Sequence, residues 1–312
     1  MKRIIMMVLR NILLVPWMWA KLCYHASHVD KYTEEEHYRM LQFITHRANK
    51  GGNVTIDAHG LENIPKENGF MFFPNHQGLY DVLSLVDVCP KPFSVVAKKE
   101  VENVPFLKQV FKCMKAYMMD RNDIRQSLQV IVNVTNEVKN GRNYLIFPEG
   151  TRSKMGNEML EFKGGSFKAA TKAKCPIVPV ALIDSFKPFD TNSIAPVTVQ
   201  VHFLKPLYYD DYKDMKTNDI AELVRSQIQK TIQEATNVNK TDVSIKISFS
   251  REGKFVIIRW INTDMLITYV KNGTNVDNSS ESADRISFEN NSFYCSNCGC
   301  AYRTSQKKKF IK

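Results

Sequence analysis

Between residues 54 and 203 the chain alternates short apolar runs with longer amphipathic runs. The short runs predict strands at 54–58, 70–73, 93–97, 116–119, 144–147, 177–183 and 197–203. The longer runs predict helices at 80–88, 104–114, 124–139 and 164–174, and a further helix at 218–235. Strands that alternate with helices are typical of a parallel sheet covered on both faces. The pattern therefore predicts an α/β fold with a mostly parallel central sheet flanked by helices.

The pattern changes on both sides of this central region. On the N-terminal side, residues 1–23 are strongly apolar. An amphipathic stretch that begins with an acidic run at 34–36 and stops at Gly51 and Gly52 predicts a capped helix over 33–50. On the C-terminal side, apolar and polar residues alternate, and a Ser/Asn-rich stretch leads to a cysteine cluster and a basic end. We therefore expect three regions. They are an apolar, membrane-anchoring helical region at 1–50, a central domain at 51–237, and a β-leaning or disordered appendage at 238–312.

The first 23 residues combine a long apolar stretch with few charges. Those charges are Lys2, Arg3, Arg10 and Lys21. Arg10 interrupts the apolar stretch and no small-residue cleavage site follows, which argues against a signal peptide. Arg10 also opposes a transmembrane span by ~2.5 to 3.5 kcal/mol, and Pro16 would kink such a helix. Trp17, Trp19 and the four cations favour an in-plane or re-entrant anchor at an anionic membrane surface, with a true span or a buried core helix as alternatives.

Composition supports a folded, basic protein. Apolar residues make up 44% of the 312 residues and charged residues 24%, which excludes a disordered, collagen-like or polytopic membrane chain. The 43 Lys and Arg against 32 Asp and Glu give a net charge of +11, so the partner surface is expected to be a phosphorylated substrate, acidic lipid or nucleic acid. Seven cysteines without a disulfide-like spacing favour a reducing, cytosolic setting.

A histidine and an aspartate follow the predicted strand at 70–73, in the sequence Pro-Asn-His-Gln-Gly-Leu-Tyr-Asp. In open α/β sheets, ligands gather at the carboxyl ends of strands. If a helix begins near Gly78, His76 just before it and Asp81 in its first turn can approach each other. Such a pair is often only a helix cap, but the carboxylate can also orient the imidazole so that its other nitrogen takes a proton from an alcohol.

A second polar segment, Phe-Pro-Glu-Gly-Thr-Arg-Ser, follows the predicted strand at 144–147. Within it, Gly150 permits close backbone approach, Thr151 offers a hydroxyl, and Arg152 supplies a planar donor fork suited to a phosphate. A third strand end carries Arg121. The repetition of such residues at successive strand ends predicts an anion-binding site at one edge of the sheet.

NHQGLYD at 75–81 together with FPEGTRS at 147–153 resembles the glycerolipid acyltransferase family, specifically the 1-acyl-sn-glycerol-3-phosphate acyltransferases. AYMMDR at 116–121 and IVPV at 177–180 resemble the intervening and final motifs of that family, in family order. The resemblance implies a general base, His76, that is oriented by Asp81. It also implies an acceptor site and a phosphate contact formed by Glu149, Gly150, Thr151, Arg152 and Arg121. Two further residues, Lys98 and Lys163, are similar to basic positions of the family.

The resemblance implies the transfer of a fatty acyl group from acyl-CoA or acyl-carrier protein to the sn-2 hydroxyl of lysophosphatidate, giving phosphatidate. The region 51–237 would be the catalytic domain. No metal or other cofactor is implied, nor an acyl-enzyme, because Cys89, Cys113 and Cys175 lie outside the motifs. Family members dock through an N-terminal apolar segment, so we expect a peripheral or monotopic protein on the cytoplasmic face of the cell membrane. Glycerol 3-phosphate or another lysolipid is an alternative acceptor.

The late cysteine cluster allows a different class of function. Cys295, Cys298 and Cys300 include one half of a zinc knuckle, but the second half is absent and a structural zinc needs four ligands. A metal-free tail is the alternative that we favour. The cluster, the net charge and the basic end together suggest a zinc-dependent nucleic-acid-binding protein. The aromatic residues do not gather with the basic ones as base stacking would require, so we expect no nucleic-acid partner.

Overall fold

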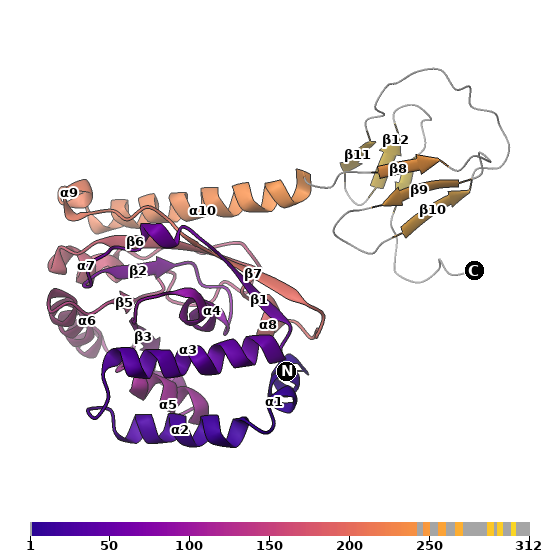
Figure 1. Cartoon of the computed structure of the whole chain (residues 1–312). Helices are drawn as coiled ribbons and strands as arrows, with labels where there is room; N and C mark the ends of the chain where they lie inside the picture. Colours follow the sequence, from indigo (N-terminus) through magenta and orange to yellow (C-terminus); the bar gives the residue numbers. More distant parts are fainter. Residues whose placement is uncertain are drawn as a thin grey trace. The chain divides into compact units, whose positions relative to one another are not determined.

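The computed structural model describes the backbone of residues 2–241 and of six short strands between residues 246 and 303, and the side chains of residues 2–236. The chain divides into two compact units, Met1–Asp242 and Val243–Lys312. The first unit contains a seven-stranded sheet and all of the acyltransferase-like motifs (Figure 1).

All seven strands that the sequence predicts for the central region are present. They are β1 (Val54–His59), β2 (Met71–Pro74), β3 (Ser94–Lys98), β4 (Tyr117–Met119), β5 (Tyr144–Leu145), β6 (Ile177–Ile183) and β7 (Val197–Phe203). Their order in the sheet is β1-β7-β6-β2-β5-β3-β4. The strands β6, β2, β5, β3 and β4 are parallel to one another, whereas β7 is antiparallel to β6 and parallel to β1. The prediction of a mostly parallel sheet is confirmed.

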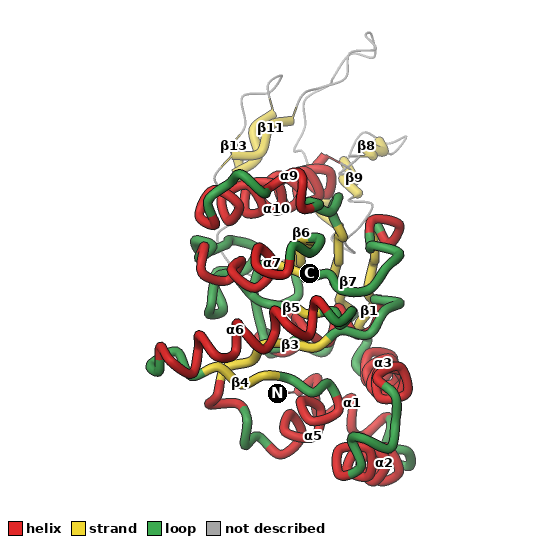
Figure 2. The backbone as a smooth tube through the Cα atoms, turned by 90° about the vertical axis from the view of Figure 1, so that its left-hand side faces the viewer, coloured by secondary structure: helices red, strands yellow, loops and turns green. Residues whose placement is uncertain are grey.

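Helices cover both faces of this sheet. The helices of the unit are α1 (Lys2–Arg10), α2 (Val15–Ser27), α3 (Glu34–Gly51), α4 (Asp81–Val88), α5 (Pro105–Cys113), α6 (Ile124–Lys139), α7 (Lys168–Ala173), α8 (Lys187–Asp190), α9 (Tyr209–Tyr212) and α10 (Thr217–Thr241). Three single 3₁₀ turns are η1 (Leu61–Asn63), η2 (Lys99–Val101) and η3 (Gly164–Phe167). In Figures 1 and 2, α10 lies on one side of the sheet and α2, α3 and α5 lie on the other. The short helices α8 and α9 were not expected from the sequence.

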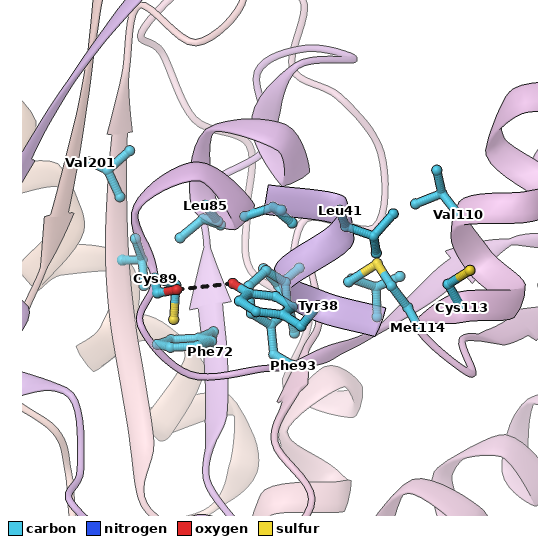
Figure 3. Close-up of a cluster of buried hydrophobic side chains, with 14 of the residues drawn as sticks. Tyr38, Leu41, Phe72, Leu85, Cys89, Phe93, Val110, Cys113, Met114 and Val201 are labelled. Atoms are coloured by element: carbon cyan, nitrogen blue, oxygen red, sulfur yellow. Dashed lines mark hydrogen bonds between the residues drawn. The ribbon is translucent and has the colours of Figure 1, made fainter. Parts of the chain in front are cut away.

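Two buried apolar clusters, one on each face, hold the layers together. The strand β6 contributes to both, because all seven of its residues are buried and alternate residues point to opposite faces. On the face covered by α2 to α5, the Phe93 ring packs against both Tyr38 and Phe72 (Figure 3). The Tyr38 hydroxyl donates to the Cys89 carbonyl at 3.2 Å, so the one polar atom of this ring is satisfied.

The N-terminal apolar stretch forms two helices rather than one. Residues between α1 and α2 form a turn, and the two helices meet at an angle of 98°. The side-chain amide of Asn11 in this turn donates to the carbonyls of Met7 and Arg47, while Pro16 lies in the first turn of α2. No single helix among the described residues is long and apolar enough to cross a bilayer; only the bent α1–α2 pair has the required length and composition.

Two of the four N-terminal cations donate hydrogen bonds to the rest of the first unit. Arg3 is buried and donates to the carbonyls of Gly52 and Ala195, the latter at 2.8 Å. Arg10 donates to the side chain of Asn53 at 2.6 Å. The expectation that the four cations favour anionic lipid is therefore wrong for Arg3, because its buried guanidinium satisfies backbone carbonyls of the first unit. Arg10 is exposed, so for it the expectation stays a prediction.

The second unit contains two small antiparallel sheets. One sheet has the order β10-β9-β8 and the other has the order β11-β12-β13. Their strands are β8 (Lys246–Phe249), β9 (Phe255–Arg259), β10 (Leu266–Val270), β11 (Ile286–Glu289), β12 (Ser292–Cys295) and β13 (Ala301–Arg303). Cys298, Cys300 and the side chain of Cys295 lie outside the described residues, so the zinc alternative stays a prediction.

Candidate active site

His76 and Asp81 form a hydrogen-bonded pair at the carboxyl end of β2. The Nδ1 atom of His76 lies 2.7 Å from Oδ2 of Asp81. The five-residue spacing produces this contact because β2 ends at Pro74, the chain turns through residues 75–80, and Asp81 is the first residue of α4. The His76 side chain is 21% exposed, whereas that of Asp81 is 1% exposed. The imidazole is therefore accessible from solvent while its partner is not.

Four donors converge on the buried Asp81 side chain. Besides His76, they are the backbone N–H groups of Gln77 and Gly78 and the hydroxyl of Ser185, which donates at 2.6 Å. An ionised Asp81 accepts all four of these hydrogen bonds through its two oxygens, with Nδ1 of His76 as the donor of the bond that the pair shares. Nε2 of His76 is then left as an acceptor.

The second motif holds the backbone of His76. The Glu149 carboxylate accepts from the His76 N–H at 2.6 Å and from the Leu160 N–H at 2.9 Å, and the Ser153 N–H donates to the His76 carbonyl at 2.8 Å. Burial raises the pKa of Glu149, although its two N–H donors act in the opposite direction. The Phe147 ring stacks on the imidazole with ring centres 3.8 Å apart. Glu149, predicted in the acceptor site, is 2% exposed and bonded through both oxygens to backbone.

Gly150 has a backbone conformation and an environment that favour glycine. Its φ is +74°, in the left-handed region, and a Cβ atom there would lie 3.2 Å from Nζ of Lys163. The ammonium group of Lys163 therefore lies over the turn of the second motif. The neighbouring Thr151 is exposed, so its hydroxyl is accessible.

The segment that follows β6 also contacts the His76–Asp81 pair. Ser185 is fully buried, donates to Asp81 through its hydroxyl, and donates its backbone N–H to the side chain of Gln77 at 2.8 Å. Gly78 lies so close to α8 that a Cβ atom would be 2.9 Å from Cα of Phe186. The sequence analysis missed Ser185, although it lies two residues beyond a predicted strand at the same edge of the sheet.

Two amide side chains also went unassigned in the sequence analysis. Asn75 is fully buried and pairs with the backbone of Leu182 in both directions, at 2.7 and 3.0 Å. Gln77 donates to the Leu182 carbonyl and to the side chain of Asn157. Both residues stand beside His76 in the first motif, and they join the ends of β2 and β6 where the backbone ladder stops.

The predicted phosphate-binding cations differ in their surroundings. Arg152 is partly exposed, and its Nη1 lies 3.8 Å from Oδ1 of Asp190. Lys98 is exposed and forms an ion pair with Glu100 at 2.6 Å. Arg121 is exposed and forms no ion pair or side-chain hydrogen bond within residues 2–236. The structure thus brings His76, Asp81, Glu149, Gly150 and Lys163 into one connected group, whereas Lys98 and Arg121 lie at the same sheet edge without direct contact to that group.

A family model described as acyltransferase matches residues 55–183, the range that contains all four motifs. The 1-acyl-sn-glycerol-3-phosphate acyltransferase of Escherichia coli (strain K12) is 31% identical over 165 residues, which cover 53% of this chain and 67% of that protein. A protein of the same description from Cocos nucifera is 28% identical over 220 residues, 69% of this chain and 66% of its own length.

The fold matches a solved structure. The crystal structure of the 1-acyl-sn-glycerophosphate acyltransferase from Thermotoga maritima has a TM-score of 0.59 to this chain at 19% sequence identity, over 74% of this chain and 98% of that chain. The α/β fold is confirmed by this likeness, and the resemblance based on the four motifs is confirmed by the family model and the relatives. The chain belongs to the glycerolipid acyltransferase family, which includes the 1-acyl-sn-glycerol-3-phosphate acyltransferases.

Proposed function

We propose that this protein transfers a fatty acyl group from a thioester donor, acyl-CoA or acyl-carrier protein, to the sn-2 hydroxyl of 1-acylglycerol 3-phosphate. The observation that carries the proposal is the His76–Asp81 pair, whose imidazole is accessible and whose carboxylate is buried among four donors. The printed names of the relatives supply the acceptor. The product would be phosphatidate, a precursor of phospholipids.

His76 acts as the general base in the proposed mechanism. Because Asp81 accepts the Nδ1 hydrogen, the lone pair of Nε2 takes the proton from the acceptor hydroxyl. The oxygen then attacks the thioester carbonyl carbon, a C–O bond forms, and the C–S bond breaks. The leaving thiolate receives the proton from the imidazolium, which the Asp81 carboxylate stabilises while it exists. Protons and electron pairs balance without a metal or a redox partner.

Three buried cysteines of the first unit support direct transfer to the acceptor. Cys89, Cys113 and Cys175 are buried, and burial raises the pKa of the Cys89 thiol to about 11 and that of the other two to about 12. The thiolate is the nucleophilic form of cysteine, and it is scarce at neutral pH when the pKa is this high. These three residues are therefore unsuited to carrying the acyl group.

The decisive experiment supplies purified full-length protein with two acceptors and two donors. Lysophosphatidate and glycerol 3-phosphate are each combined with acyl-CoA and with acyl-carrier protein, and the products are identified by mass spectrometry. We expect phosphatidate from lysophosphatidate, with the faster donor identifying the physiological thioester. Faster acylation of glycerol 3-phosphate, or no acyl transfer with any pair, would contradict the proposed acceptor.

Replacement of Arg152 with alanine is expected to raise the apparent KM for lysophosphatidate by ~10- to 150-fold. The reason is that one charge-assisted hydrogen bond to the acceptor phosphate, of ~1.5 to 3 kcal/mol, is lost. The KM for the acyl donor should change much less. Arg39→Ala, at an exposed arginine of α3, is the control and should leave both constants unchanged. A rise confined to the donor KM would show that Arg152 binds the thioester substrate instead.

We further propose that the protein associates with one face of the cell membrane, on the cytoplasmic side, through the exposed faces of α1 and α2. Large apolar side chains are exposed on both helices and on the turn between them: Ile4, Ile5, Val8, Leu9, Ile12, Leu13, Trp17 and Trp19. The opposite faces of these helices pack on the first unit through Met7, Met18 and Leu22. This division favours a helix pair that lies in the interface rather than one that crosses the bilayer.

The double variant Leu9→Ser/Leu13→Ser tests this anchor. The two side chains are 62% and 91% exposed, so their loss should leave the fold intact while removing apolar area from the lipid contact. Because burial of one such side chain contributes ~1.5 to 3 kcal/mol, vesicle affinity should fall by at least about tenfold in a sedimentation assay. High salt should weaken the wild-type binding only partly, since apolar burial is not screened. Unchanged sedimentation of the variant would exclude this surface as the anchor.

A further inference from the structure

Exposed large apolar side chains are unevenly distributed between the two edges of the sheet. The five parallel strands end at the edge that carries His76, and β7, which runs the other way, begins there. Loops and first helical turns at this edge expose a set of residues that we call the apolar rim: Leu79, Val104, Phe106, Ile124, Met155 and Ile194. At the opposite edge, the loops after β1 and β7 expose only Leu61 and Tyr208 among the described large apolar residues.

The rim lies outside the buried apolar core. None of its six side chains belongs to a buried cluster of the first unit or packs against one. Ile124, at the start of α6, is 75% exposed, and Leu79, three residues after His76, is 55% exposed. One exposed apolar residue is ordinary, but their recurrence in the loops that follow β2, β3, β4, β5 and β6 indicates a surface that contacts another apolar phase.

The rim is continuous with the proposed α1–α2 anchor. Helices α2 and α5 pack together and run in the same direction, because Cys113 at the end of α5 contacts the Leu22 carbonyl and Lys115 contacts Asp30. The start of α5, with Phe106, therefore lies beside the start of α2, near the turn that exposes Leu13. Figure 1 shows α2 and α5 side by side.

The charges next to the rim favour an anionic surface. In the two segments that flank Phe106 and Ile124, residues 98–108 and 120–125, the chain has five Lys or Arg and four Asp or Glu. Glu100 and Asp120 are engaged by Lys98 and Lys99. Within residues 2–236, no ion pair engages Arg121, Arg125 or Lys154, which adjoin the rim residues Ile124 and Met155; these cations can therefore contact anionic headgroups.

We propose that the apolar rim is a second lipid-contact surface, which seats the sheet edge carrying His76 in the headgroup region of the leaflet that α1 and α2 bind. The inference rests on the proposed function, since it explains how a membrane-resident acceptor reaches His76. Two contact areas, the helix pair and the rim, fix the orientation of the first unit. The acceptor then places its hydroxyl and phosphate at the site while its acyl chain stays in the bilayer.

The double variant Phe106→Ser/Ile124→Ser separates the rim from catalysis. The full-length protein is assayed with lysophosphatidate in anionic vesicles and with a short-chain lysophosphatidate that is monomeric in water. We expect kcat/KM to fall by at least about tenfold with vesicles and by less than about twofold with the soluble acceptor, because only the first requires the lipid contact. Leu61→Ser, at the opposite sheet edge, is the control and should change neither value. Equal losses on both acceptors, or no loss on either, would overturn the proposal.

Hydrogen–deuterium exchange provides a test that does not depend on activity. Addition of anionic vesicles to the wild-type protein should slow exchange in residues 99–106 and 120–124, but not in residues 60–64 at the opposite edge. Unchanged exchange in the two rim segments would overturn the lipid contact, as would a concentration-dependent dimer that the double variant abolishes. Failure of acyl transfer on both acceptors would contradict the proposed function, whereas the exchange result would still decide the lipid contact.

Discussion

Replacing His76 with alanine is expected to reduce acyl transfer by at least ~10²- to 10⁴-fold, the usual contribution of general-base assistance. The variant loses the acceptor nitrogen that Asp81 orients, while its backbone bonds to Glu149 and Ser153 persist. The fold should therefore be preserved, and kcat should fall far more than the KM for either substrate changes. Steady-state kinetics, with thermal melts to verify folding, measure both effects.

The matched control for this variant is His46→Ala. His46 is 73% exposed on α3 and contacts only Asp87 at ion-pair distance, so its loss should leave the rate within about twofold of the wild type. If folded His76→Ala turned over at a near-normal rate, His76 could not be the general base.

The substitution Asp81→Asn is expected to lower kcat by at least about 10²-fold. It removes the charge that stabilises the imidazolium and replaces one acceptor oxygen by an NH₂ group that faces the N–H and O–H donors around it. Substrate binding should change little, because Asp81 is buried away from the accessible face of the imidazole. The separate values of kcat and KM therefore distinguish a positioning defect from a binding defect.

Asp87→Asn makes the same chemical change on the same helix. Asp87 lies at the other end of α4 and contacts His46 rather than His76, so this variant should retain activity within a few-fold. Comparable losses in Asp81→Asn and Asp87→Asn would indicate that destabilisation of α4, and not loss of the carboxylate beside His76, explains the effect.

Most of the fold could be predicted from the sequence, because the spacing of apolar residues that marks each strand and helix is a local property of the chain. A run such as 177–183, apolar at every position, is typical of a strand covered on both faces, and β6 is indeed buried throughout. The helix over Ile124–Lys139 was likewise indicated by its amphipathic spacing, and Asp123 caps it by accepting from Gln126 N–H. The antiparallel direction of β7 could not be predicted from the sequence, because a strand with alternating side chains pairs with an antiparallel neighbour as well as with a parallel one.

The candidate site could be predicted from the sequence only in part. The spacing of His76 and Asp81 is a local property of a strand end and a helix start, so their contact could be predicted. Ser185 is separated from Asp81 by 104 residues, and no local pattern relates them. Glu149 is a further example: its type suggests a substrate contact, but its two hydrogen bonds to backbone depend on how the second motif folds against the first.

The sequence by itself determined the strand and helix pattern, the location of the motifs at strand ends and the apolar character of the N-terminus. These features follow from composition and from the spacing of nearby residues, because strands repeat every two residues and helices about every 3.6. Only the tertiary structure decided that Arg3 is buried against the backbone, that Ser185 joins the Asp81 carboxylate, and that exposed apolar residues gather at one sheet edge. Each of these depends on which distant segments pack together, and burial or exposure of a side chain is set by that packing rather than by its neighbours in sequence.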